Sequence, residues 1–132
     1  MRSFQTTVDG PIDEVESAVR DALAAEGFGI VSEVDVAANL RAALGVDRPP
    51  LKILGACSPR FAQDALGIDP SIALLMPCNV VLEPDGTRTR VAVIDPRDLV
   101  TSPALEQLAV DAADRLAGAL TALGGQVSEV AA

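Results

Sequence analysis

Residues 78–96 read CNVVLEPDGTRTRVAVIDP, and this stretch decides the fold that we expect. Two expected strands, the aliphatic run 80–82 and the run 90–94, which is aliphatic after Arg90, flank the turn residues Pro84, Asp85 and Gly86. Asp-Gly between two such runs is typical of a β-hairpin. The hairpin makes two sheet neighbours antiparallel, although helices separate the strands in most of the chain. We therefore expect a mixed sheet rather than a parallel one.

Hydrophobic periodicity and turn residues predict the other elements. Strands are expected at 2–8, 28–34 and 51–57, and one bent strand or two short ones at 72–82. Helices are expected at 11–26, 36–44, 59–66 and 103–123, and the tail 126–132 either frays or adds a weak strand. In the helix 36–44, the residues expected to face inward are Val36, Leu40 and Leu44.

The order β-α-β-α-β-α-β-β-α predicts the class α+β. We expect a two-layer sandwich in which helices pack on one face of the mixed sheet. The length of 132 residues fits a single domain over 1–132. A chain of this length buries enough surface to fold without disulfides or metal.

Charge and composition exclude several classes of partner. Ten Lys and Arg against nineteen Asp and Glu give an acidic chain of net charge −9, which repels nucleic acids and anionic lipids. We expect no nucleic-acid partner and no membrane partner. The N-terminus shows no signal-peptide pattern, and no apolar run reaches the roughly 18 residues of a membrane span. These features predict a cytoplasmic protein with reduced thiols.

The sequence contains no histidine, the side chain most often used as a general base and as a transition-metal ligand. Ser-His-Asp catalysis, Cys-His catalysis and His-based metal sites are therefore excluded within one chain. We expect no catalytic residues, no metal and no cofactor, and the balance favours a protein that is not an enzyme.

The two cysteines are the most informative candidates for a site. Cys57 precedes Ser58 and Pro59 where a strand meets a helix, and Cys78 lies between Pro77 and Asn79. Backbone N–H groups at a helix start favour a thiolate. If the two strands are neighbours, both thiols lie at one end of the sheet. The pair then suits a ligand or redox site, or two sulfur ligands of a soft metal completed across a dimer.

A simpler interpretation treats both cysteines as small core hydrophobes, because free cysteine is often buried. Three nearby polar residues have two interpretations each. Lys52 is a desolvated nucleophile or a strand-end side chain that reaches solvent. Asp95 is a carboxylate of the same cleft or the cap of a turn. Asn79 binds a ligand or satisfies a buried backbone group.

Five segments, GFGIVSEVDV (27–36), LRAALGV (40–46), KILGACSP (52–59), LLMPCNVVL (74–82) and VAVIDP (91–96), together form a pattern. In this order they resemble the bacterial and archaeal domain-of-unknown-function family 302, over about residues 4–120. The resemblance implies a small α+β domain, a homodimer and no established biochemical activity. It also implies that Cys57, Pro59, Pro77 and the pair Asp95-Pro96 are motif positions. Ser58 departs from the Asn that is frequent in the family.

The resulting hypothesis is a non-catalytic homodimeric module with a cleft for a small molecule. The expected ligand-binding residues are Cys57, Ser58, Pro59, Pro77, Cys78, Asn79 and Asp95. The alternative is a cysteine-based redox protein or thiol enzyme that acts on sulfur or peroxide species. A third possibility is a pure interaction module that pairs subunits through the helix 103–123 or a sheet edge.

Overall fold

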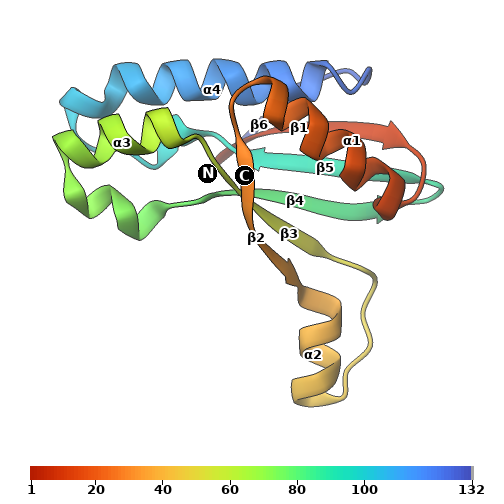
Figure 1. Cartoon of the computed structure of the whole chain (residues 1–132). Helices are drawn as coiled ribbons and strands as arrows, with labels where there is room; N and C mark the ends of the chain where they lie inside the picture. Colours follow the sequence, from red (N-terminus) through yellow and green to blue (C-terminus); the bar gives the residue numbers. More distant parts are fainter. Residues whose placement is uncertain (132) are drawn as a thin grey trace.

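The computed structural model describes residues 1–131, which form a six-stranded sheet and four α-helices (Figure 1). The strands are β1 (Arg2–Asp9), β2 (Gly29–Asp35), β3 (Lys52–Cys57), β4 (Cys78–Asp85), β5 (Arg88–Ile94) and β6 (Ser128–Ala131). The α-helices are α1 (Ile12–Ala25), α2 (Val36–Leu44), α3 (Pro59–Ile68) and α4 (Glu106–Thr121). Three 3-10 helices complete the chain: η1 (Pro70–Leu75), η2 (Pro96–Asp98) and η3 (Pro103–Leu105).

The predicted hairpin is present as β4 and β5, which pair from Asp85 and Arg88 at the turn to Val80 and Val93. Gly86 has a φ of 63°, a backbone conformation that glycine adopts without steric cost. The strand order in the sheet is β2-β3-β4-β5-β1-β6. The tail thus adds a weak strand, since β6 pairs with β1 over four residues.

The expected mixed sheet is wrong, because every pairing among the described strands is antiparallel. Helices that separate consecutive strands suggested parallel neighbours. However, α1 connects β1 to β2 at opposite parts of the sheet, and α2 and α3 connect neighbouring strands that run in opposite directions. The α+β class and the two layers are confirmed.

The segment 70–75 also differs from the prediction, because it forms η1 and not a strand. Asp69 caps this turn by accepting hydrogen bonds from the backbone N–H and the hydroxyl of Ser71. The Met76–Pro77 peptide bond is cis, and β4 begins directly after it. Only the second half of the predicted 72–82 strand is therefore extended.

Three helices, α1, α3 and α4, cover one face of the sheet (Figure 1). The core lies between this layer and the strands. Its fully buried members include Val19 and Leu23 of α1, Leu116 and Leu120 of α4, and Leu54, Val80, Leu82, Val91 and Val93 of the sheet. Among residues 1–131, no helix is long and apolar enough to cross a membrane.

The helix α2 is the exception, because it stands away from the other three at the far end of β2 and β3 (Figure 1). We call residues 34–51 the arm. Its helix begins at the Asp35 cap, whose carboxylate accepts from the Ala38 N–H, and ends at Gly45. The prediction that Val36, Leu40 and Leu44 face a core is wrong, since none of them is buried and Leu44 is 70% exposed.

A close contact at Gly55 holds three segments together. A Cβ atom at this position would lie 2.1 Å from Oγ of Ser32 in β2 and 2.6 Å from Cγ of Pro77. Both distances are far below van der Waals contact. The absence of a side chain at residue 55 therefore lets Ser32 and the Pro77 ring lie directly against β3.

Replacing Gly55 with alanine should lower the free energy of unfolding by about 1–3 kcal/mol, because the Pro77 ring has to move away. Denaturant unfolding measures this change. Gly67→Ala is the matched control: no atom lies within 4 Å of the added Cβ, and Gly67 is helical. The control should stabilise by about 0.5–1 kcal/mol. A Gly55→Ala protein as stable as the wild type would contradict the contact.

Candidate functional site

A small pocket of about 100 Å³ opens between the ends of β3 and β4 and the helices α3 and α4. Both cysteines line it. The complete lining is Phe28, Ala56, Cys57, Ser58, Phe61, Ala62, Ala65, Ile72, Met76, Pro77, Cys78 and Ala112. Most of these side chains are apolar, so the pocket suits a small ligand with little polar surface. We call it the sulfur pocket.

The strand register brings the cysteines together. Cys78 begins β4 and pairs with Ala56, the residue before Cys57 at the end of β3. The next residue, Ser58, is buried and caps α3, since its Oγ accepts from the N–H of Phe61 at 3.5 Å. Cys57 therefore lies where β3 ends and the positive end of the α3 dipole begins.

The Cys78 thiol is a poor nucleophile at neutral pH. Burial is the larger cause and the nearby Cys57 the smaller one, and together they raise the pKa of Cys78 to about 11. Both effects disfavour the thiolate, which is the reactive form of cysteine. Both cysteines are free thiols.

Four of the seven predicted residues, Cys57, Ser58, Pro77 and Cys78, line the sulfur pocket. Pro59 and Asn79 lie outside it. Pro59 is the exposed first residue of α3. Asn79 is exposed and, with Pro77, lines a separate shallow groove of about 300 Å³. Successive strand residues point to opposite faces, so Asn79 turns away from the face that Cys78 uses.

Asp95 is also outside the pocket, and it is only 1% exposed. It caps η2 through the N–H of Arg97 and forms an ion pair with the Arg97 guanidinium at 2.5 Å. Burial would raise the pKa of Asp95, but the Arg97 hydrogen bonds outweigh it and the pKa is lowered. This carboxylate is fully occupied in holding the turn.

Two kinds of lining residue escaped the sequence analysis. Met76 adds a third sulfur atom. The indication in the sequence was its position two residues before Cys78. Phe28 and Phe61 form a stacked pair with ring centroids 6.1 Å apart, and both line the pocket. No local pattern connects Phe28 with α3, because the two rings meet only through the tertiary fold.

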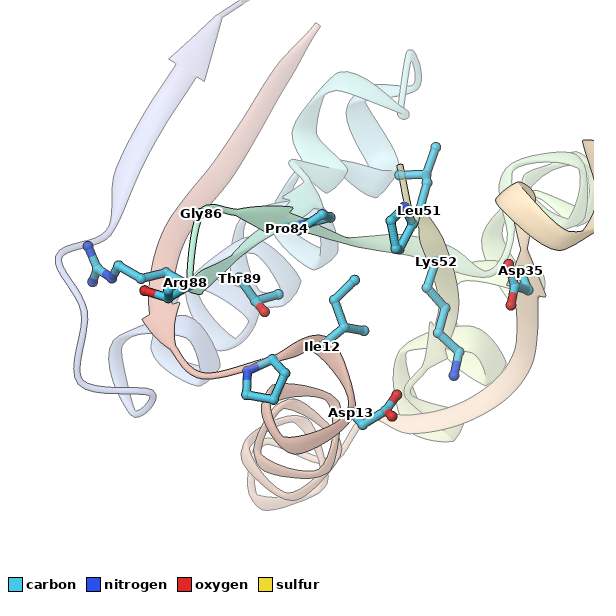
Figure 2. Close-up of a pocket in the computed structure, with 12 residues that line it drawn as sticks. Ile12, Asp13, Asp35, Leu51, Lys52, Pro84, Gly86, Arg88 and Thr89 are labelled. Atoms are coloured by element: carbon cyan, nitrogen blue, oxygen red, sulfur yellow. The ribbon is translucent and has the colours of Figure 1, made fainter. Parts of the chain in front are cut away.

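A larger open cleft of about 590 Å³ lies at the other end of the sheet, between the start of α1, the base of the arm and the β4–β5 turn (Figure 2). Lys52 points from β3 toward α1, whereas Arg88 points away from the centre of the cleft (Figure 2). The Lys52 ammonium lies 2.5 Å from both Glu16 and Glu33, and Arg88 pairs with Asp9 at 2.7 Å.

These ion pairs give the cleft a structural role. The hydrogen bonds that the Lys52 ammonium donates, first to Glu16 and then to Glu33, raise the pKa of Lys52, so its amine stays protonated and is not a nucleophile. Arg20 also bridges Glu16 and Glu33, at 2.9 Å from each. The cluster ties α1 to β2 and β3.

The comparisons with known proteins agree with this architecture. The model of the family "Domain of unknown function DUF302" matches residues 4–123. A crystal structure of an uncharacterised conserved DUF302 protein from Bacillus stearothermophilus is similar, with a TM-score of 0.84 and 27% sequence identity. The similarity covers 91% of this chain and 96% of that one. No curated protein matches the chain.

Lys52→Met should lower the free energy of unfolding by about 1–3 kcal/mol, because it leaves the half-buried Glu16 carboxylate without its closest cation. Urea unfolding at neutral pH provides the measurement. Arg88→Met in the same cleft is the control, since its partner Asp9 is 91% exposed. The control should change stability by less than about 1 kcal/mol. If both substitutions lower the free energy of unfolding equally, the Lys52 cluster contributes no more to stability than an exposed ion pair.

Proposed function

The chain belongs to the DUF302 family, and we propose that it is a non-catalytic homodimeric module that binds a small ligand in the sulfur pocket. One observation carries this proposal. Two cysteines that are 21 positions apart in the sequence meet in one apolar pocket, together with Ser58 and Pro77. An apolar pocket with a few convergent polar groups is the usual form of a small-molecule site.

The chemistry around the pocket supports binding rather than catalysis. The raised pKa of Cys78 disfavours a thiolate at that position. The Asp95 carboxylate, expected in the same cleft, is engaged by Arg97. The pocket therefore supplies shape and soft sulfur atoms to a ligand. No observation favours the redox or thiol-enzyme alternative.

The arm supports the homodimer. Its helix α2 has nine residues and no buried side chain, and helices this short have little stability of their own in water. Val34, Leu44 and Val46 are exposed apolar residues of the arm. Arg41 is the one charged residue within α2, so the net charge of −9 adds little local repulsion here. A second copy of the chain is the occupant that we propose for this surface.

A cytoplasmic site of action is part of the proposal. Cys57 and Cys78 are close neighbours and yet free thiols, which fits a reducing compartment. Neither thiol is needed as a structural crosslink, because the core packs without one.

Native protein should react with iodoacetamide at Cys57, because the side chain is half-buried and lines an open pocket. Ala65→Leu should slow this reaction severalfold by filling the pocket from α3. Mass spectrometry of alkylated peptides measures the rates. Ala122→Leu, an exposed change at the end of α4, is the control and should leave the rate unchanged. If neither cysteine reacts without denaturant, the pocket is closed and the cysteines are core residues.

Light scattering at micromolar concentration should give the mass of a dimer. Leu44→Asp should yield monomers, because it places a charge in the proposed arm interface. Leu74→Asp is the matched control: Leu74 is 87% exposed but lies on η1, outside the arm. That variant should remain dimeric. A monomeric wild type would exclude the homodimer, and a dimeric Leu44→Asp protein would exclude the arm as its interface.

A further inference from the structure

The sulfur pocket contains more sulfur-containing side chains than an ordinary apolar cavity needs. The chain has two cysteines and two methionines, and three of these four side chains line this one pocket. Cys57 comes from the end of β3, Cys78 from the start of β4, and Met76 from the turn before β4. Three separate backbone positions thus bring sulfur to the same small volume.

We propose that the sulfur pocket binds one copper(I) ion through the thiolates of Cys57 and Cys78 and the thioether of Met76. This inference rests on the proposed function and names the chemical class of its ligand. Thiolate and thioether sulfur are soft ligands that select copper(I) among biological metal ions. Cysteine is also the only side chain of the pocket that can supply negative charge to a cation.

The ligand set disfavours other metals. Structural zinc prefers four ligands in a tetrahedron, drawn from cysteine, histidine and carboxylates. Within residues 1–131, no three side chains of these types converge on a common point. Calcium and magnesium require oxygen ligands, which the pocket does not provide in number. Two thiolates and one thioether are sufficient for copper(I), which accepts low coordination numbers.

Copper(I) binding has to outweigh the burial that raises the pKa of Cys78, because both thiols lose their protons in the complex. The stacked rings of Phe28 and Phe61 form an apolar wall, which limits the access of water. The complex carries a net charge of −1, since one monovalent cation binds two thiolates. The positive end of the α3 dipole begins at Ser58, beside the pocket, and stabilises a negative charge there.

The binding step is balanced without an oxidant. The S–H bonds of Cys57 and Cys78 break, and their two protons pass to the solvent. Two copper–thiolate bonds and one copper–thioether bond form. Copper remains in the +1 state throughout, and no sulfur atom is oxidised.

The test is an anaerobic titration of the reduced, full-length protein with copper(I) in the presence of the chromogenic chelator bicinchoninate. The wild type should withdraw one copper(I) per chain from the chelator. Cys57→Ser and Cys78→Ser should abolish this transfer. Met76→Leu keeps the volume and removes the sulfur, and it should weaken binding by about tenfold or more. X-ray absorption should count three sulfur neighbours of copper in the wild type and two in Met76→Leu.

Ile68→Leu is the matched control, because Ile68 is an exposed apolar residue of α3, lies outside the lining of the pocket and carries no sulfur. Its affinity for copper(I) should equal that of the wild type. Unchanged affinity of Met76→Leu would overturn the three-sulfur site, and half an equivalent of copper per chain would show a site shared between two chains instead. Equally tight retention of zinc(II) would overturn the selectivity.

The alkylation experiment separates the two proposals. If Cys57 reacts with iodoacetamide and Ala65→Leu slows it, but copper(I) stays with the chelator, the pocket stands and its ligand is not copper. If neither thiol reacts in the native protein, the ligand pocket itself is wrong and the copper site falls with it.

Discussion

The bare α-carbon of Gly55 is the constraint on which the site depends. Ser32 and the Pro77 ring occupy the space that any side chain at this position would need. The contact brings β2 and the segment before β4 against the middle of β3. Cys57 lies two residues further along β3, and Cys78 follows Pro77 directly. The packing of the Pro77 ring against Gly55 therefore positions the start of β4, and with it Cys78, next to the end of β3.

Local patterns predicted most elements of the fold, because capping residues and apolar periodicity act over a few positions. The α1 face of Val15, Val19 and Leu23 and the β4–β5 hairpin are examples. Strand direction depends instead on where each connection returns in the sheet, which no local pattern encodes. The arm shows the same limit. The apolar spacing of α2 is that of a core helix, but its surroundings place it outside the core.

The sequence predicted the part of the site that lies at the ends of strands. The sequence placed Cys57 and Cys78 at one end of the sheet on the condition that their strands are neighbours. The structure meets this condition, because β3 and β4 pair antiparallel and the end of one lies beside the start of the other. Asn79 lies outside the pocket because adjacent strand residues face opposite sides of the sheet. Asp95 lies outside it because its carboxylate accepts hydrogen bonds from Arg97 in its own turn. Met76 lies in a turn, where no periodicity assigns a direction to a side chain. Only the tertiary structure places the Met76 side chain in the same pocket as Ile72 and Pro77.

The strand β3 connects the arm and the sulfur pocket, the two features for which we propose a function. Lys52 begins it at the base of the arm, and Cys57 ends it in the sulfur pocket. Six residues in an extended strand span about 20 Å. Between these ends, Leu54 and Ala56 are buried, and Ser32 and the Pro77 ring occupy the space that a side chain of Gly55 would fill. The strand β3 therefore has little freedom to shift. We therefore do not expect a ligand bound in the pocket to shift the arm through β3. We therefore expect the proposed dimer formation and the proposed ligand binding to be independent of each other.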